Sequence, residues 1–252
     1  MEHQSRHTDD YIFGTRAIIE AIHFGKQIDK ILMKIGQNNE LTQELTELIR
    51  EHNIPIQRVP VERLDRITRK NHQGVIALMS PVAFCQIEDV VAQTFENGEM
   101  PFIIALDGIT DVRNFGAIVR SAECAGVHAI VVPEKGASRI GPDAVKTSAG
   151  ALHKVPICRT SSLKKTLQML MDSGLTICGA TEKTDNLYFN QELTGPLCIV
   201  MGAEDEGLSD EIFRLCQPLL KIPILGEIES LNVSAAAAVL MYEVVRQRNT
   251  TK

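Results

Sequence analysis

The chain has 252 residues, of which 44% are hydrophobic, and this is enough for one large domain or two smaller ones. It carries 26 lysine and arginine side chains against 32 aspartate and glutamate side chains, a net charge of −6, which argues against a protein that binds polyanions over its whole surface. Residues 1–80 hold equal numbers of basic and acidic side chains, so the amino-terminal third repels a polyanion least.

Cysteine usage and the length of the apolar runs indicate a cellular compartment. No two of the six cysteines are spaced as a pair of metal ligands, and most lie in apolar runs, which is typical of small buried side chains in a reducing cytosol. The first ten residues contain no apolar signal-peptide core, and no stretch approaches the about 18 apolar residues that a membrane span requires. We therefore expect a soluble, cytoplasmic protein without a membrane segment.

The first third of the chain alternates short helices and strands. Apolar spacing favours a helix over residues 11–25, ended by Gly25, and a second helix over 38–53 with Asn39 as its cap. A proline-opened helix and three strands complete the unit, at 60–68 and at 30–36, 54–59 and 74–80. We place a small α/β domain at residues 9–80.

Residues 81–99 open on a proline and contain one predicted helix and a polar turn, and we take them as a linker. From residue 100 to residue 248, apolar strands alternate with helices. The strands are expected over 102–108, 127–133, 155–160, 175–181, 197–204 and 219–224. Because these strands do not alternate apolar with polar residues, they indicate a parallel sheet covered on both faces. The expected fold class is α/β in both domains.

Three polar turns follow apolar strands of the second domain, where open α/β sheets bind ligands. In the first turn, Asn114 and Gly116 precede an expected helix that carries Arg120 among apolar neighbours. Asn114 is either a helix cap or a functional amide, and Arg120 is either a surface cation or a functional one. The glycine pattern G-x-G-x-x-G is missing, which counts against a nucleotide-dependent oxidoreductase on a doubly wound sheet.

The second turn combines Gly202 with three consecutive acids, residues 204–206, and with Ser209 as a cap for the next helix. A glycine at this position lets a ligand approach the backbone closely, and Glu204 beside it is suited to orient a hydrogen-bond donor. Adjacent carboxylates of one turn cannot all face inward, so we predict no metal ion here.

The third turn places Ser230, Leu231 and Asn232 before a helix that begins with a run of four alanines, residues 235–238. A plain helix cap accounts for one of the polar residues and leaves the others unexplained. The alanines allow this helix to approach a neighbour closely, and that neighbour is the sheet, a second subunit or a bound ligand.

Taken together, the stretches NFGAIVRSAECAG, IVMGAEDEGLS and IPILGEIESLNVSAAAAVLMYEVVRQR resemble, in order and spacing, the three motifs of the SpoU (TrmH-like) RNA ribose 2′-O-methyltransferases. The stretches GTRAIIEAI and NHQGVIAL are similar to the RNA-binding domain of the branch that acts on large-subunit ribosomal RNA. The resemblance covers residues 11–248. It implies methylation of a ribose 2′-hydroxyl with S-adenosylmethionine, on a guanosine of 23S ribosomal RNA first and on transfer RNA second. A catalytically silent RNA-binding or assembly factor is the remaining alternative.

The resemblance also implies a role for individual residues. The catalytic group would be Asn114, Arg120, Glu204, Ser230 and Asn232, with Arg120 activating the ribose hydroxyl. The cofactor would be held by Ala180, Thr181, Gly202, Ile222 and Leu231. The family forms homodimers, and its carboxyl-terminal chain threads a trefoil knot. Asp205 departs from the family pattern, since relatives often have a small or neutral residue there, and it adds negative charge beside the cofactor.

Two questions stay open at the level of the sequence. A guanidinium is normally always protonated, so Arg120 either loses its proton transiently with help from an RNA phosphate, or stays charged and clamps the phosphate. RNA contact is expected in the first domain, where five basic residues lie within 58–70, although acids at 62 and 65 are equally compatible with a solvated face. Tyr11 and Phe13 either stack on bases or pack in the core.

Overall fold

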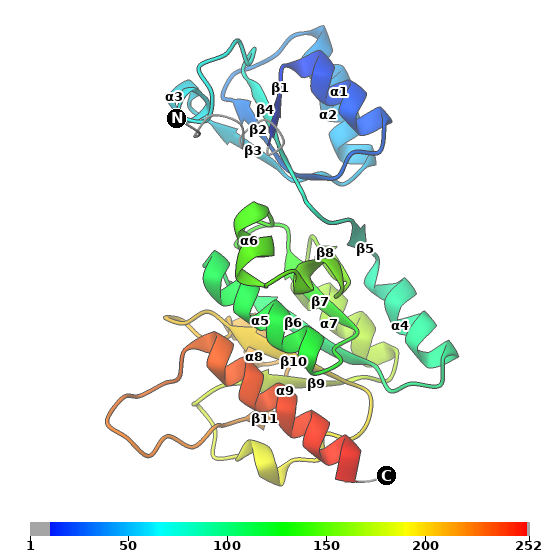
Figure 1. Cartoon of the computed structure of the whole chain (residues 1–252), viewed down its shortest axis with the longest axis vertical. Coiled ribbons are helices and arrows are strands. Elements are labelled where there is room, and N and C mark those ends of the chain that lie inside the picture. The colour runs from blue at the N-terminus through cyan, green and yellow to red at the C-terminus, as the bar shows by residue number, and fades with distance from the viewer. Residues whose placement is uncertain (1–10, 251–252) are drawn as a thin grey trace. The chain divides into compact units, whose positions relative to one another are not determined.

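The computed structural model describes residues 11–250. The chain divides into two compact units: the first contains the residues up to Ala83 together with Ile140–Pro142, and the second contains Phe84–Arg139 and the residues from Asp143 onward. The first ten residues, which include the predicted start of the first domain at residue 9, lie outside the described part. Each unit has its own sheet (Figure 1). Both contain helices and strands, so the predicted α/β fold class is confirmed.

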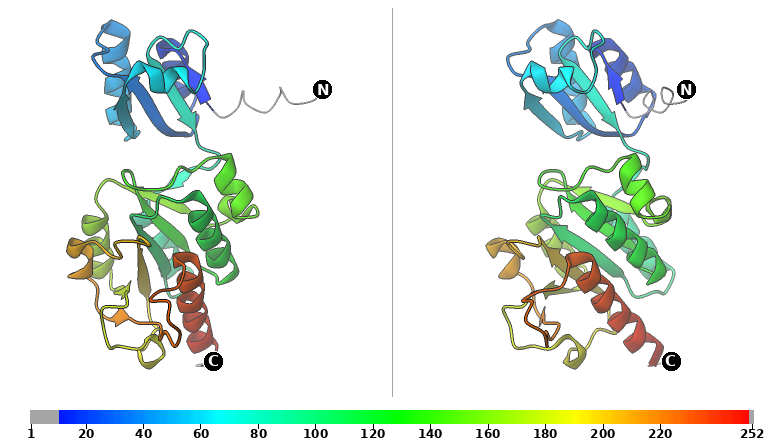
Figure 2. Two further views of the ribbon diagram at one scale, coloured as in Figure 1. Left: turned by 90° about the vertical axis from the view of Figure 1, so that its left-hand side faces the viewer. Right: turned by 60° about the vertical axis from the view of Figure 1, so that its left-hand side comes forward.

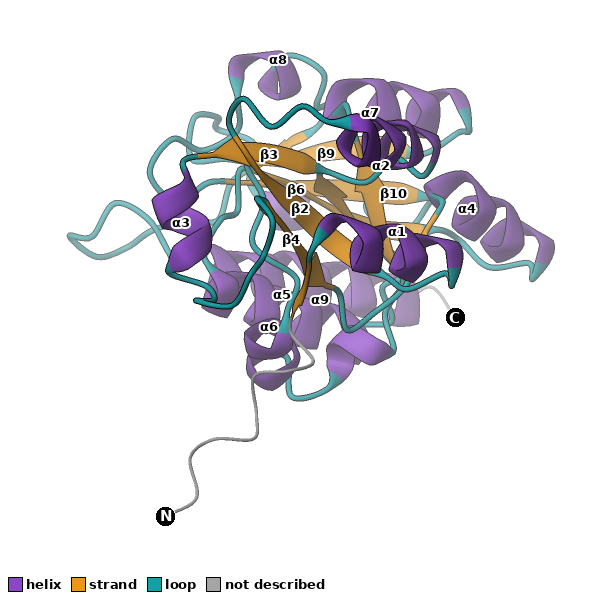
Figure 3. Cartoon of the chain, turned by 90° about the horizontal axis from the view of Figure 1, so that it is seen from above, coloured by secondary structure: helices purple, strands orange, loops and turns teal. Residues whose placement is uncertain are grey.

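The first unit is a mixed four-stranded sheet with helices on both faces. Along the chain its elements are β1 (Tyr11–Phe13), α1 (Thr15–His23), β2 (Ile28–Lys34), α2 (Glu40–Glu51), β3 (Ile56–Val59), α3 (Val61–Asp65) and β4 (Val75–Met79). The strand order is β1-β4-β2-β3, in which β4 is antiparallel to both neighbours and β2 is parallel to β3. Apolar residues of α1 and α2 pack on one face, and those of α3 pack on the other (Figure 3).

Local sequence signals located these elements with one correction. Asn39 caps α2 as predicted, since its Oδ1 accepts a hydrogen bond from the Thr42 N–H at 2.9 Å. The helix predicted over residues 11–25 is wrong in its first turn, because residues 11–13 form β1 and place Ile12 opposite Ala77 of β4. Gly14, with a φ of 88°, ends this strand and allows α1 to begin at the next residue.

The second unit is built on a seven-stranded sheet in which every paired strand is parallel. Its strands are β5 (Phe84–Cys85), β6 (Phe102–Asp107), β7 (Ala129–Pro133), β8 (Ile157–Thr160), β9 (Thr176–Ala180), β10 (Leu197–Gly202) and β11 (Leu219–Leu220). Their order in the sheet is β11-β9-β10-β6-β7-β8-β5. The parallel sheet is therefore confirmed, whereas the trefoil knot stays a prediction.

Helices cover both faces of this sheet, as the continuous apolar strands predicted. The helices are α4 (Ile87–Glu96), α5 (Val112–Cys124), α6 (Pro142–Thr147), α7 (Leu163–Asp172), α8 (Asp210–Phe213) and α9 (Val233–Thr250), with short 3-10 turns at Ala151–His153 and Tyr188–Asn190. Apolar residues of α4, α7 and α8 pack on one face. On the other face α9 packs along α5 (Figure 2).

The segment that we predicted as a linker, residues 81–99, contributes regular structure to the second unit. β5 pairs with β8 at the edge of the parallel sheet, where Cys85 lies opposite Cys158. Ile87 and Val91 of α4 belong to the same apolar cluster as the α7 leucines.

The carboxyl-terminal helix is anchored at both ends. Near its end, Arg248 donates hydrogen bonds to the carbonyl oxygens of Met100, Pro101 and Gly195, at 3.0, 3.2 and 2.7 Å. These carbonyls lie just before β6 and β10, so the helix end is fixed to the start of the two central strands. Its beginning is held by the turn described below.

The structure makes a direct prediction for thiol reactivity. The thiols of Cys158, Cys178, Cys198 and Cys216 are buried, and burial raises the pKa of Cys158, Cys178 and Cys216 to about 12. Because the thiolate is the reactive form, we expect these four to react with a disulfide reagent at pH 8 only after unfolding in guanidinium. The exposed Cys124 should react fast in the native protein, and the half-buried Cys85 more slowly.

The assignment is checked with Cys124→Ser, which should remove the fast phase and leave the rest of the time course unchanged. Fast reaction of three or more thiols in the native protein would contradict the burial of the cysteines in the sheet.

Candidate active site

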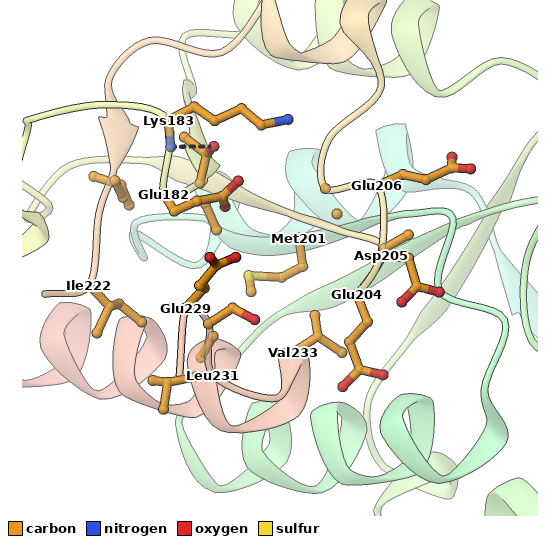
Figure 4. A pocket seen from close by; sticks show the side chains of 18 of the residues that line it. Glu182, Lys183, Met201, Glu204, Asp205, Glu206, Ile222, Glu229, Leu231 and Val233 are labelled. Carbon is orange, nitrogen blue, oxygen red and sulfur yellow. Dashed lines mark hydrogen bonds between the residues drawn. The ribbon is translucent and has the colours of Figure 1, made fainter. Parts of the chain in front are cut away.

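A pocket of about 320 Å³ lies at the carboxyl ends of β9, β10 and β11 (Figure 4). This is the edge at which the parallel sheet was expected to bind a ligand. The pocket is closed from the other side by the segment between β11 and α9 and by the first turns of α9. Its apolar wall consists of Met201, Leu220, Ile222, Leu231, Val233 and Leu240. Its volume falls within the range that small-molecule ligands and cofactors occupy.

All five residues that we assigned to the cofactor line this pocket, although they come from three separate parts of the chain. Ala180 and Thr181 follow β9, Gly202 ends β10, and Ile222 and Leu231 lie in the segment between β11 and α9. The structure thus brings together residues that only the family resemblance had grouped.

The structure gives a further reason for a glycine at position 202. Gly202 is buried, and a Cβ there would overlap the backbone of Gly207 and Leu208. The chain turns back on itself at this point: the Ala203 and Gly207 backbone groups exchange two hydrogen bonds, of 3.1 and 2.9 Å. This tight turn by itself excludes a side chain at position 202, and close approach of a ligand to Gly202 stays a prediction.

Three side chains from the three motifs form one hydrogen-bonded group. Asn114 of α5 donates through Nδ2 to Glu204 Oε2 at 2.9 Å, and Asn232 donates through Nδ2 to Asn114 Oδ1 at 2.9 Å and also to Glu204 Oε1. We refer to Asn114, Glu204 and Asn232 as the motif triangle. Since each carboxylate oxygen accepts an amide hydrogen, these bonds are of the stronger, charge-assisted kind.

Other hydrogen bonds show whether Asn114 and Asn232 cap their helices. The cap of α5 is Asp111, whose Oδ1 accepts from the Arg113 and Asn114 N–H groups at 2.8 Å, so Asn114 is not the cap. Asn232 does cap α9, because its Oδ1 accepts from the Ser234 N–H at 3.0 Å. The amide of Asn232 therefore serves two purposes, one through its oxygen and one through its nitrogen.

Two members of the predicted catalytic group lie outside the triangle. Ser230 lines the pocket, and its side chain makes no hydrogen bond to any residue within 11–250. Arg120 is exposed and does not line the pocket. It comes six residues after Asn114 on the same helix, so the two side chains lie about 120° apart around the helix axis. The buried face of α5 contains Ile118, Val119 and Ala122, and Arg120 points away from it.

Sequence reasoning missed the charged rim of the pocket. Glu182, Lys183 and Glu229 line it together with the three acids at 204–206, so the pocket holds five carboxylates and one ammonium group. Figure 4 shows Glu204, Asp205 and Glu206 pointing in different directions, as expected for neighbours in one turn. Their positions in the sequence could have indicated these residues, because Glu182 and Lys183 closely follow β9 and Glu229 directly precedes Ser230.

A cation suits this pocket better than an anion. Within residues 11–250, none of the carboxylates of Glu182, Asp205, Glu206 and Glu229 forms an ion pair, so their charge is not neutralised by the protein. No group of three or more His, Cys, Asp or Glu side chains in the same part of the chain is placed to hold a metal ion. An organic cation with an apolar body fits both the charge and the apolar wall.

In the first unit, two aromatic residues, Tyr11 and Phe13, are half-buried. Tyr11 and Phe13 pack against the apolar cluster beneath α3, and the Lys70 ammonium lies 5.8 Å from the centre of the Phe13 ring. The loop that carries Lys70 is fixed by His72, whose ring contacts Asp65 Oδ1 at 2.9 Å and accepts from the Gly74 N–H at 3.0 Å. No helix of residues 11–250 is long and apolar enough to span a bilayer.

Comparison with known proteins agrees with the geometry. Residues 101–242 match the SpoU rRNA Methylase family, and residues 11–85 match the family of RNA 2′-O ribose methyltransferase substrate-binding domains. A Bacillus subtilis protein assigned to the TrmH family of tRNA/rRNA methyltransferases is 33% identical over 95% of this chain and 96% of its own length.

Two solved structures show the same likeness. The SpoU methyltransferase AviRb from Streptomyces viridochromogenes, in complex with the cofactor AdoMet, is 25% identical and has a TM-score of 0.60 over 95% of this chain and 90% of its own. A TrmH/SpoU tRNA-modifying enzyme from A. aeolicus is 26% identical, with a TM-score of 0.54 over 66% of this chain and 85% of its own. The chain therefore belongs to the SpoU family of RNA 2′-O-ribose methyltransferases.

Proposed function

We propose that this enzyme methylates the ribose 2′-hydroxyl of a guanosine in large-subunit ribosomal RNA, with S-adenosylmethionine as the methyl donor. The observation that carries the proposal is the pocket at the ends of β9, β10 and β11, whose rim meets the motif triangle. The substrate-binding family match over residues 11–85 supports an RNA substrate. The similarity of GTRAIIEAI and NHQGVIAL to the ribosomal branch supports the choice of ribosomal over transfer RNA.

The residues of the pocket fit this donor. S-adenosylmethionine supplies a methyl group on a positively charged sulfur. It also carries a flat adenine ring, an ammonium group and a carboxylate, so its net charge is about +1. Ile222 and Leu231 would hold the adenosine, together with backbone at Ala180, Thr181 and Gly202. The unpaired carboxylates of the rim complement the positive charges, because opposite charges attract strongly in a partly enclosed site.

We assign to the motif triangle the task of holding the reaction site in shape. Glu204 fixes both amides, so the turn after β10, the start of α5 and the start of α9 keep one relative position. We assign to Arg120 the role of a clamp: its planar fork binds an RNA phosphate and stabilises negative charge that develops on the ribose oxygen.

The position of Arg120 favours a homodimer in which it serves the pocket of the partner. Within its own chain it is turned away from Asn114 and contributes nothing to the lining. The small side chains at the beginning of α9 leave room for a second helix to pack there. In a symmetric dimer each protomer would supply one Arg120 and receive the other.

The first prediction concerns Arg120. Arg120→Lys keeps the positive charge and loses the planar fork, so we expect kcat to fall by about 10²- to 10³-fold. Binding of S-adenosylmethionine, measured by titration calorimetry, should stay unchanged. Near-normal turnover of this variant would contradict the proposed role of the Arg120 guanidinium.

Mixed dimers separate action within one chain from action across the interface. Arg120→Ala and Asn232→Ala are each expected to be inactive. If Arg120 serves the partner, random mixing and reassembly of the two variants restores about a quarter of the wild-type activity, since half of the dimers are mixed and each has one complete site. A mixture that stays inactive contradicts a shared site.

A second prediction separates the two purposes of Asn232. Asn232→Ser retains an oxygen that can cap α9 and loses the amide that reaches Glu204, whereas Asn232→Ala loses both. We expect both variants to lose methyl transfer, and the alanine variant to lose about 1 kcal/mol more unfolding free energy in urea than the serine variant, because only serine keeps the cap. Full activity and wild-type stability of the serine variant, with stability lost in the alanine variant, would leave Asn232 as a cap alone.

The substrate is tested by incubating the protein with labelled S-adenosylmethionine and total RNA. We expect the label in large-subunit ribosomal RNA, at one guanosine whose 2′-O-methyl group is missing from RNA of cells that lack the protein. Label in transfer RNA would show that transfer RNA, and not large-subunit ribosomal RNA, is the substrate. Tight binding of RNA without transfer of label would contradict the enzymatic function and favour an assembly factor.

A further inference from the structure

A polar hollow of about 600 Å³ lies in the first unit, between α2 and the carboxyl ends of β2 and β3. Its wall contains the amides of Gln37, Asn38 and Gln43 and the guanidinium groups of Arg50 and Arg58. Nothing in the proposed reaction uses these side chains. The hollow contains no aromatic residue and no large apolar one, so it is not the remainder of a core.

The strand register fixes which face of the sheet the hollow belongs to. Arg58 lies opposite Met33 in the parallel pair of β3 and β2, and Met33 packs in the apolar cluster of α1 and α2. Leu32 and Val59 point the other way, into the cluster beneath α3. Because side chains alternate along a strand, Arg58 faces α2 and its neighbour Gln57 faces the α3 side. Arg58 Nη1 lies 3.8 Å from Met33 Sδ, which confirms its side.

The amides of the hollow are already held in place by the protein. Gln43 Nε2 donates to Asn38 Oδ1 at 3.3 Å, and this bond uses neither the Gln43 Oε1 acceptor nor the Asn38 Nδ2 donor. Gln37 Nε2 donates to the Gln73 carbonyl at 3.1 Å, so its side chain lies over the Gly74 turn. A paired acceptor and donor of this kind match the hydrogen-bonding edge of an unpaired base, and fixed side chains lose little entropy on binding.

The charge of the hollow is suited to an anion. Arg50 and Arg58 line it with one acid, Glu47, and neither guanidinium forms an ion pair with a residue between 11 and 250. This contrasts with the pocket of the second unit, where carboxylates outnumber cations. Arginine binds phosphate with two parallel hydrogen bonds.

We propose that this hollow binds one unpaired nucleotide of the RNA substrate, with the base on the Asn38–Gln43 amide pair and the phosphate on Arg50 and Arg58. The inference rests on the proposed function and names a point of contact for its substrate. Sequence-specific recognition of RNA targets single-stranded loops and bulges, whose bases are free to enter such a site. A free mononucleotide offers the same chemistry, and the test below distinguishes the two sources.

The test compares variants inside the hollow with matched variants on the opposite face of the same sheet. Arg58→Ala and Gln43→Ala remove one guanidinium and one amide from the hollow. Arg63→Ala and Gln57→Ala remove the same groups from exposed positions on the α3 side. All four use the full chain, and all four residues are exposed, so the fold is expected to persist; thermal melting checks this.

The dissociation constant for deproteinised large-subunit ribosomal RNA is measured by filter binding, without methyl transfer. We expect it to rise about tenfold for Arg58→Ala and Gln43→Ala and less than twofold for both controls. The salt dependence should weaken for Arg58→Ala and not for Gln43→Ala, because only the guanidinium replaces a counterion. The KM for RNA should rise in parallel, with kcat and the affinity for S-adenosylmethionine unchanged.

Equal effects of hollow and control variants would overturn the proposal, because they would indicate a general electrostatic contribution of the unit. So would calorimetric binding of GMP or AMP at micromolar concentration together with unchanged RNA affinity of Arg58→Ala, since the hollow would then be a mononucleotide site. RNA binding is measured separately from methyl transfer. An absence of methyl transfer would therefore contradict the proposed function, while the filter-binding result alone would decide whether the hollow binds RNA.

Discussion

The hydrogen bonds of Glu204 to Asn114 and Asn232 are the interaction on which the architecture of the site depends. They join residues that lie 90 and 28 positions apart, and the third bond of the triangle spans 118 positions. An ionised carboxylate accepts only, and an amide nitrogen donates only, so each bond has one possible direction. Replacing any member leaves a donor or acceptor unmatched at the edge of the pocket, which costs more than the loss of one bond between neutral groups.

Rigid elements deliver the three side chains to this point. Asn114 lies in the first turn of a helix capped by Asp111, Glu204 follows a fully buried strand, and Asn232 begins a helix whose far end is held by Arg248. The tight turn at Gly202 sets the direction in which the chain leaves the strand. The remainder of the pocket wall, between β11 and α9, has no regular structure, so its shape depends on the anchored ends on either side.

The sequence predicts most of what depends on short-range order. Apolar spacing located α2 and its Asn39 cap, and continuous apolar strands indicated a parallel sheet with helices on both faces. Sequence reasoning failed where the decisive partner is distant: residues 11–13 form a strand because β4 lies beside them, and the overlap of a side chain at position 202 with Gly207 was not foreseen. The motif triangle could be grouped only by family resemblance, since no local pattern shows that Asn114 meets Asn232. The polar hollow went unnoticed because its residues, read along α2, are indistinguishable from a solvated helix face.

The distribution of charge explains why two units are needed. A pocket with five carboxylates attracts a cationic cofactor and repels the phosphates of RNA, and at physiological ionic strength this repulsion extends over about 8 Å. Affinity for RNA therefore has to arise from other groups that carry positive charge. Residues 1–80 have no net charge, so the first unit does not repel a polyanion as the acidic pocket does. In the proposed function, cofactor binding and RNA binding place opposite demands on surface charge, and we assign each demand to a different unit.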